Sequence, residues 1–116
     1  MNRALVAAGA INGAIAVAAG AFAAHALRAR LEPRALEVFE TGARYQMYHA
    51  LAMVLCGLLA MTRPGWIFQV GIVLFSGSLY ALAGSGVKGL GAITPFGGVA
   101  FLVGWGWMAY TALTSR

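Results

Sequence analysis

His25, Arg44 and His49 are the side chains in this sequence best suited to chemistry. His25 closes a long apolar stretch, and Arg44 and His49 open the next one. Imidazole is a common haem ligand and can carry protons, and arginine can bind an anionic headgroup. On adjacent helices the two histidines would lie at similar depth. We expect no cofactor, and a b-type haem held between His25 and His49 is the alternative that these residue types leave open.

The residues around Arg44 share a helical spacing. Glu40, Arg44 and Tyr48 are four apart, as are Tyr45 and His49, and side chains at this spacing lie on one helix face. An arginine at the bilayer centre costs roughly 2.5–3.5 kcal/mol on insertion scales. We therefore predict that Arg44 lies at the membrane boundary and is paired with Glu40. The pair either locks its helix to the neighbouring helices or forms part of a site for a headgroup or another anionic ligand.

More polar side chains fall at the same expected end of the molecule. We predict a binding site there for a lipid headgroup or a partner protein, because the opposite end offers few polar groups. The candidate site residues are His25, Glu40, Arg44, Tyr45, Gln46, Tyr48, His49, Ser78, Tyr80 and Thr94.

Other patterns argue against catalysis and metal binding. Cys56 is the single cysteine, so an internal disulfide or a multi-thiolate metal site is excluded. Residues 84–89 spell GxGxxG, but an apolar helix precedes them and not the strand that a dinucleotide site requires. No serine or cysteine is placed beside a histidine and a carboxylate, as a nucleophile needs. We expect no enzyme activity and no metal site.

Long apolar stretches are the elements that must position these residues. Between Arg3 and Arg28 the chain has 24 residues without a formal charge. As a helix this stretch would reach roughly 36 Å, enough to cross a bilayer with some tilt, and it is longer than the core of a signal peptide. The whole chain is 61% hydrophobic and 9% charged, whereas soluble domains carry about 25% charged residues. We therefore expect a membrane protein.

The predicted fold class is all-α: an integral membrane four-helix bundle forming a single domain over residues 1–116. We expect helices at about 4–27, 33–61, 66–83 and 95–113. Arg63-Pro64-Gly65 is predicted to be a turn and residues 84–93 a loop, after which Thr94 caps the last helix. A short amphipathic helix near the headgroups is expected between the first two crossings, beginning at Pro33 and running into the second helix.

Polar and small residues inside the helices predict how they pack. Asn12 lies near the middle of the first helix, and its amide needs a partner in lipid, for which Ser76 and Ser78 are candidates. Gly9 and Gly13 form a GxxxG pair, which allows two helix backbones to approach closely. The pair serves either packing within the chain or self-association.

Four segments of this chain resemble one family. They are GAFAAHAL at 20–27, FETGARYQMYHALA at 39–52, FSGSLYALA at 75–83 and LGAITPFGG at 90–98. Together they are similar to the YgdD-like group of small bacterial inner-membrane proteins of unknown function, which is related to a eukaryotic transmembrane protein of similar size. The resemblance implies a four-helix integral membrane protein and supplies no activity, cofactor or substrate. The polar positions shared with the family are those of the candidate site, together with Ser76 and Pro95.

We expect a non-enzymatic protein of the inner membrane that binds a lipid headgroup, a quinone-like ligand or a partner subunit. The expected partners are membrane lipids and either further copies of the chain or a larger membrane complex. An oligomeric small-solute or ion transporter or channel is the alternative. Nucleic acid is not an expected partner, because the net charge of +5 comes from residues at the ends of apolar runs and not from a basic stripe.

The charge distribution predicts the orientation of the chain in the membrane. Cytoplasmic loops carry an excess of Lys and Arg, so the segment 28–44 is expected in the cytoplasm and both termini outside. The two sides hold Arg28, Arg30, Arg34, Arg44 and Lys88 against Arg3, Arg63 and Arg116.

A reporter fused after Arg116 tests this orientation. Alkaline phosphatase, which is active only outside the cytoplasm, should be active in the fusion, and green fluorescent protein exported by the same route should be dark. A fluorescent green fluorescent protein fusion together with an inactive phosphatase fusion would place the termini in the cytoplasm and reverse the assignment.

Overall fold

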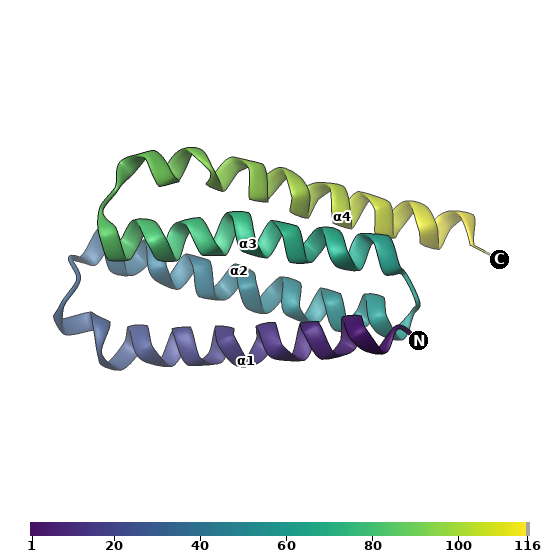
Figure 1. Ribbon diagram of the computed structural model, residues 1–116, viewed down its shortest axis with the longest axis horizontal. Helices are drawn as coiled ribbons and strands as arrows, with labels where there is room; N and C mark the ends of the chain where they lie inside the picture. Colours follow the sequence, from purple (N-terminus) through teal and green to yellow (C-terminus); the bar gives the residue numbers. More distant parts are fainter. Residues whose placement is uncertain (116) are drawn as a thin grey trace.

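The computed structural model of the chain describes residues 1–115, and its regular elements there are all helices. Arg116, which the charge count assigns to the same side of the membrane as both termini, lies outside the described residues. Four long helices alternate in direction, so that both ends of the chain lie at one end of the molecule (Figure 1). They are α1 (Arg3–His25), α2 (Pro33–Leu58), α3 (Thr62–Ser85) and α4 (Thr94–Thr114), with short 3-10 helices η1 (Leu27–Ala29) and η2 (Lys88–Ala92) in the connections.

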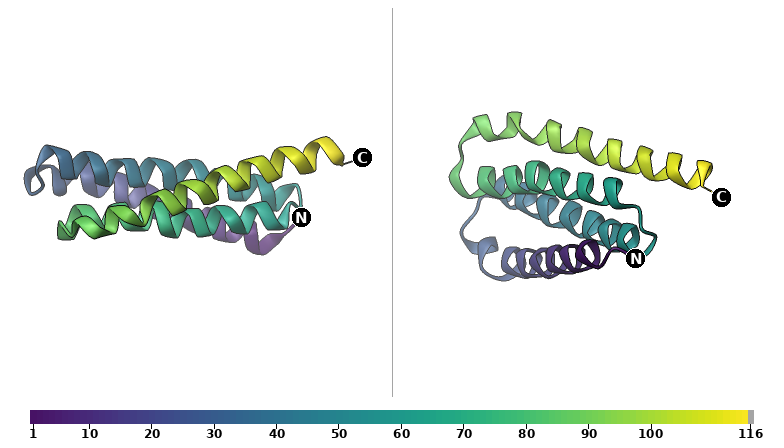
Figure 2. Two further views of the ribbon diagram at one scale, coloured as in Figure 1. Left: turned by 90° about the horizontal axis from the view of Figure 1, so that it is seen from above. Right: turned by 45° about the vertical axis from the view of Figure 1, so that its right-hand side comes forward.

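The helices form an open array and not a closed bundle. Each helix packs on the next one in the chain, and α1 and α4 stand at opposite edges (Figures 1 and 2). The molecule is accordingly long and flat, with extents of 52 × 26 × 17 Å. This arrangement leaves a groove between α1 and α3 and another between α2 and α4.

The short amphipathic helix expected to run into the second helix is not confirmed as an element of its own. Residues 33–44 are the first turns of α2, which continues unbroken to Leu58. The apolar face at Phe39 and Ala43 stays in helical phase with the buried Gln46, Ala50 and Met53, so one helix buries both parts. Pro33 starts this helix as expected, because its missing N–H would have had no partner in the first turn.

Two helix starts differ from the prediction. The turn lies at residues 59–61, where Ala60 has a φ of 58°, and α3 already begins at Thr62. Pro64 is tolerated in the first turn of α3 because no intrahelical donor is needed there. Thr94 does not cap α4, because its hydroxyl bonds to the Ser78 hydroxyl at 2.6 Å across to α3.

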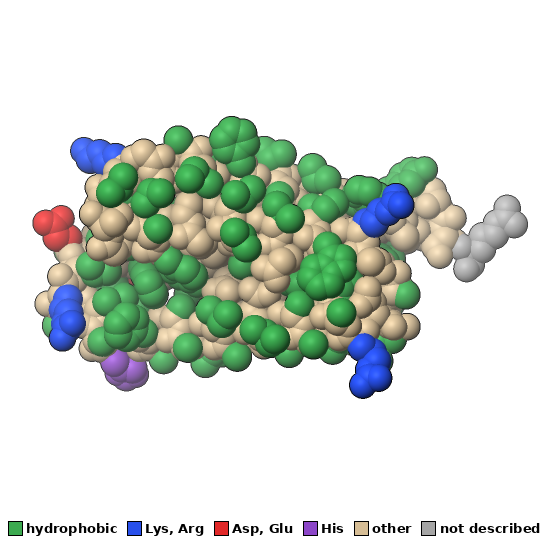
Figure 3. Space-filling view, viewed as in Figure 1, with side chains coloured by type: hydrophobic (Ala, Val, Ile, Leu, Met, Phe, Trp, Pro, Cys, Tyr) green, Lys and Arg blue, Asp and Glu red, His purple; other side chains and the backbone are tan. Residues whose placement is uncertain are grey.

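Three segments are long and apolar enough to cross a membrane: α1, α3 and the stretch from η2 through α4. α2 is not among them, because charged residues occupy its first half and Gln46 and His49 follow. Apolar side chains cover the visible face of the molecule, and the charged ones lie toward its two ends (Figure 3). Crossing by α2 stays a prediction.

Close approach of α1 to α2 depends on one glycine of the GxxxG pair. A Cβ atom on Gly9 would lie 2.8 Å from the carbonyl oxygen of Ala50 and 2.9 Å from the backbone nitrogen of Val54. A Cβ atom on Gly13 would meet nothing within 4 Å. Gly9 therefore serves packing within the chain, whereas Gly13 leaves its face of α1 open.

Gly9→Ala should lower the free energy of unfolding in detergent by about 1–3 kcal/mol, because the backbones of α1 and α2 must move apart. Gly13→Ala is the matched control and should leave this free energy unchanged or raise it, since alanine favours the helix. Far-UV circular dichroism during titration with sodium dodecyl sulfate measures both. Equal losses in the two variants would contradict the assigned α1–α2 contact.

Candidate functional site

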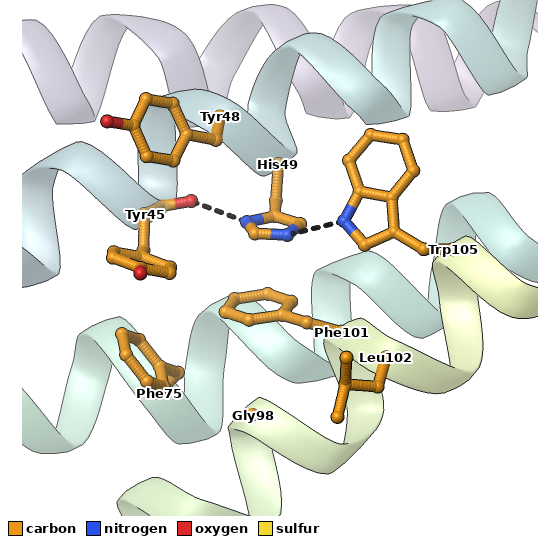
Figure 4. A pocket seen from close by; sticks show the side chains of 8 residues that line it. All are labelled: Tyr45, Tyr48, His49, Phe75, Gly98, Phe101, Leu102 and Trp105. Carbon is orange, nitrogen blue, oxygen red and sulfur yellow. Dashed lines mark hydrogen bonds between the residues drawn. The ribbon is translucent and has the colours of Figure 1, made fainter.

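The groove between α2 and α4 is an aromatic cleft of about 450 Å³. Tyr45 and Tyr48 of α2 lie at one end of it and Trp105 of α4 at the other (Figure 4). We call this space the α2–α4 cleft; its lining residues are Tyr45, Tyr48, His49, Phe75, Gly98, Phe101, Leu102 and Trp105.

His49 is fixed on three sides in this cleft. Its Nδ1 lies 2.8 Å from the carbonyl oxygen of Tyr45, and the indole N–H of Trp105 donates to its Nε2 at 3.0 Å (Figure 4). Indole can only donate, so Nε2 is the acceptor and the proton is on Nδ1. The imidazole also stacks on Phe101, with ring centroids 3.6 Å apart and planes 5° apart. His49 thus ties α4 to α2 as a neutral ring.

The phenol groups of the cleft have hydrogen-bonding capacity left. Among the tyrosines of residues 1–115, Tyr80 is the one whose hydroxyl bonds to another side chain. Tyr45 and Tyr48 are 38% and 53% exposed. Aromatic walls with two phenol donors can hold a flat apolar molecule that carries an acceptor oxygen.

The expected similar depth of His25 and His49 is wrong. α2 begins at Pro33, which places His49 past its middle, and the neighbouring Ala50 contacts Gly9 near the start of α1. At about 1.5 Å per residue, His25 lies roughly 24 Å further along α1 than Gly9. Both ring nitrogens of His49 are also engaged. These two histidines therefore cannot clasp one haem.

Two predicted site residues, Gln46 and Tyr80, belong to a chain of hydrogen bonds on the other face of α2. Tyr80 donates to Gln46 Oε1 at 2.7 Å, and Gln46 Nε2 donates to Asn12 Oδ1 at 3.0 Å. Asn12 Nδ2 then donates to Gln69 Oε1 at 2.8 Å. The chain links α1, α2 and α3 and lies along the groove between α1 and α3.

The serine partners expected for Asn12 are wrong. Ser76 donates to the carbonyl oxygen of Gly42 at 2.7 Å, on α2, and Ser78 bonds to Thr94 on α4. Gln69, which the sequence analysis did not single out, accepts from Asn12 instead.

The predicted ion pair between Glu40 and Arg44 is also wrong. Arg44 is exposed and donates from Nη2 to the Thr41 hydroxyl at 3.2 Å, and the ion pair found within residues 1–115 joins Arg34 to Glu37 at 3.6 Å. In the same range no three His, Cys, Asp or Glu side chains meet as a metal site requires.

The ten predicted residues therefore occupy separate places. Tyr45, Tyr48 and His49 line the α2–α4 cleft, Gln46 and Tyr80 join the hydrogen-bond chain, and the remaining residues lie elsewhere. The latter are Ser78 and Thr94, which join α3 to α4, and His25, Glu40 and Arg44 toward the charged end.

Sequence reasoning missed the contribution of α4 to the cleft. Gly98, Phe101 and Trp105 recur at helical spacing, which is a signal that they share one face. Gln69 also carried a signal, because a lone amide inside an apolar stretch needs a partner.

Comparison with known proteins gives a consistent family. Residues 19–98 match the family described as "Protein of unknown function (DUF423)". The chain is 48% identical over 105 residues to "UPF0382 membrane protein YwdK" of Bacillus subtilis, a match covering 84% of this chain and 85% of that protein. It is 43% identical over 115 residues to a UPF0382 membrane protein of Haemophilus influenzae, covering 92% and 91%.

No solved structure matches this chain. The resemblance noted from the sequence is confirmed as far as a small membrane protein family is concerned, and the YgdD-like assignment stays a prediction. With three segments able to span a membrane and relatives named membrane proteins, the chain is an integral membrane protein. It belongs to the DUF423 family, whose curated relatives are the UPF0382 membrane proteins.

Proposed function

We propose that this chain is a non-enzymatic binding protein that takes a flat, quinone-like molecule from the lipid phase into the α2–α4 cleft. The observation that carries the proposal is the cleft itself: an aromatic space of about 450 Å³ whose inner wall is an immobilised imidazole on a phenylalanine. Volumes of about 300–1,000 Å³ are usual for small-ligand sites.

The chemistry of the lining suits a ring that carries carbonyl groups. Aromatic faces attract another ring in offset or edge-on contact, and Tyr45 and Tyr48 supply hydroxyl donors at one end. Because His49 already bonds at both nitrogens, it shapes the cleft and does not need to change its protonation for binding. A ligand would therefore enter a site that is already organised, which limits the entropy lost on binding.

The same observations favour binding over transport. A transporter would require Glu40, Arg44 or His49 to face a water-filled cavity along a path through the membrane. Arg44 instead bonds locally to Thr41, and His49 is 5% exposed among aromatic rings. We place this activity in the inner membrane, either in a homo-oligomer or as an accessory subunit of a larger complex, with lipids around the helices.

Filling the cleft tests the proposal. Gly98 lines the cleft and Gly106 does not, and a Cβ atom at either position of α4 meets nothing within 4 Å. Gly98→Leu should therefore occupy the cleft without moving the backbone, and Gly106→Leu is the matched control. We expect duroquinone affinity to fall at least about tenfold, or by about 1.4 kcal/mol, in Gly98→Leu and to be unchanged in Gly106→Leu.

The measurement is quenching of Trp105 fluorescence by duroquinone in liposomes, with Trp66 and Trp107 replaced by phenylalanine. Binding gives quenching that saturates, whereas random partition into the bilayer gives quenching that rises without saturation. Saturable quenching of equal affinity in Gly98→Leu, or none in the parent protein, would refute a site in the cleft.

A further inference from the structure

The hydrogen-bond chain across α1, α2 and α3 has a fixed direction. Asn12 Nδ2 donates to the carbonyl oxygen of Ala8 at 2.9 Å, and a carbonyl oxygen can only accept. This contact establishes which end of the Asn12 amide is the nitrogen. The Gln69 atom facing that nitrogen must therefore be an oxygen, and the Gln46 atom facing Asn12 Oδ1 must be a nitrogen.

The direction has a consequence at each end of the chain. At one end Tyr80 donates its proton to Gln46 Oε1. At the other end the Gln69 oxygen is used, so the Gln69 NH₂ group points away from Asn12 with two donors. Within residues 1–115 it finds no acceptor, and every fully buried side-chain nitrogen or oxygen there has a partner, so this NH₂ group reaches the molecular surface.

The surface that it reaches is the groove between α1 and α3. This groove holds about 360 Å³, and its walls are largely apolar, with Ile15 on α1 and Ile72, Val73 and Gly77 on α3. The face of the molecule between these two helices is hollowed in Figure 3. We call this space the α1–α3 groove.

Depth in the membrane makes the free donor costly. α3 is long and apolar enough to cross a membrane, and Gln69 lies about 7 Å along the helix axis from its middle. In a crossing centred on the bilayer, this position falls inside the hydrocarbon core, which extends about 15 Å to either side of its centre. Water is scarce at that depth, and an unsatisfied N–H costs several kcal/mol there. Bonds in series also polarise one another, which makes the last donor of this chain a strong one.

We propose that the α1–α3 groove binds an uncharged lipid-phase molecule whose ketone-type carbonyl oxygen accepts a hydrogen bond from the Gln69 NH₂ group. The carbonyl must lie within the hydrocarbon, so an apolar molecule wholly inside the bilayer fits, whereas the ester groups of phospholipids lie too near the headgroups. This site is separate from the α2–α4 cleft, which uses other residues on α2 and α4.

A labelled ketone tests the assignment. The probe is 10-nonadecanone with ¹³C at its carbonyl, added to liposomes that contain the full chain. Infrared difference spectra should show a population of the ¹³C=O band moved to lower frequency by hydrogen bonding. Gly77→Leu should abolish that population, because it fills the groove at a position where a Cβ atom meets nothing within 4 Å.

Three further variants separate the outcomes. Gly84→Leu, also unobstructed on α3 but outside the groove, should keep the shifted band, and Gly98→Leu should keep it because that change fills only the other site. Gln69→Leu should lose it while circular dichroism shows the helices intact. A shifted band that persists in Gly77→Leu and Gln69→Leu, or that is absent from the parent protein, overturns the proposal. Cysteines placed at Ile15 or Val73 test whether a second copy of the chain covers the groove instead. Cross-linking of two copies through these cysteines, with no room left for the ketone, would also overturn the proposal.

Discussion

The arrangement of the first three helices depends on the need of buried amides for partners where water is absent. Each hydrogen bond between membrane helices contributes modestly, about 0.6 kcal/mol on average, but an amide left unpaired in hydrocarbon costs several times more. Asn12 and Gln46 satisfy this need with each other and with Gln69, whose oxygen accepts from Asn12 while its NH₂ group faces the α1–α3 groove. Because one amide on each helix must meet the others, the rotation of each helix about its axis is restricted, and the faces that remain outside are apolar.

Small residues and aromatic rings hold the array together where amides do not. Gly9 lets α1 touch the backbone of α2, and Gly97 brings α4 against the backbone of Phe75 on α3. α4 buries few residues of its own, so its position relies on the stack of His49 on Phe101, the Trp105 bond and the Ser78–Thr94 contact. The polar groups of His49, Ser78 and Thr94 therefore hold α4 in place through contacts within the chain.

An open array leaves more surface for ligands than a closed bundle would. Because α1 and α4 do not meet, α2 and α3 each have one face at the bottom of a groove. The two grooves differ in chemistry: one is lined by aromatic rings, and the other contains the end of a hydrogen-bond chain. Adjacent residues of α2, Tyr45 and Gln46, contribute to different grooves because neighbouring helix positions point in different directions.

The sequence by itself determined the class of the protein, because apolar runs of this length are typical of helices that span a membrane. It also determined which residue types inside those helices needed partners. The pairing followed only from the tertiary structure. Spacing along one helix suggested Glu40 as the partner of Arg44, and polarity suggested Ser76 or Ser78 as the partner of Asn12. Arg44 instead bonds to Thr41, one turn away, and Asn12 bonds to Gln69 and Gln46. Likewise, α2 could be recognised as helical, but the depth of His49 depended on where that helix begins and on which part of α1 it meets. Sequence patterns report the local helical period and the polarity of each face. The rotation and offset of packed helices arise instead from contacts between residues distant in the sequence, and this rotation and offset decide which side chains share a groove.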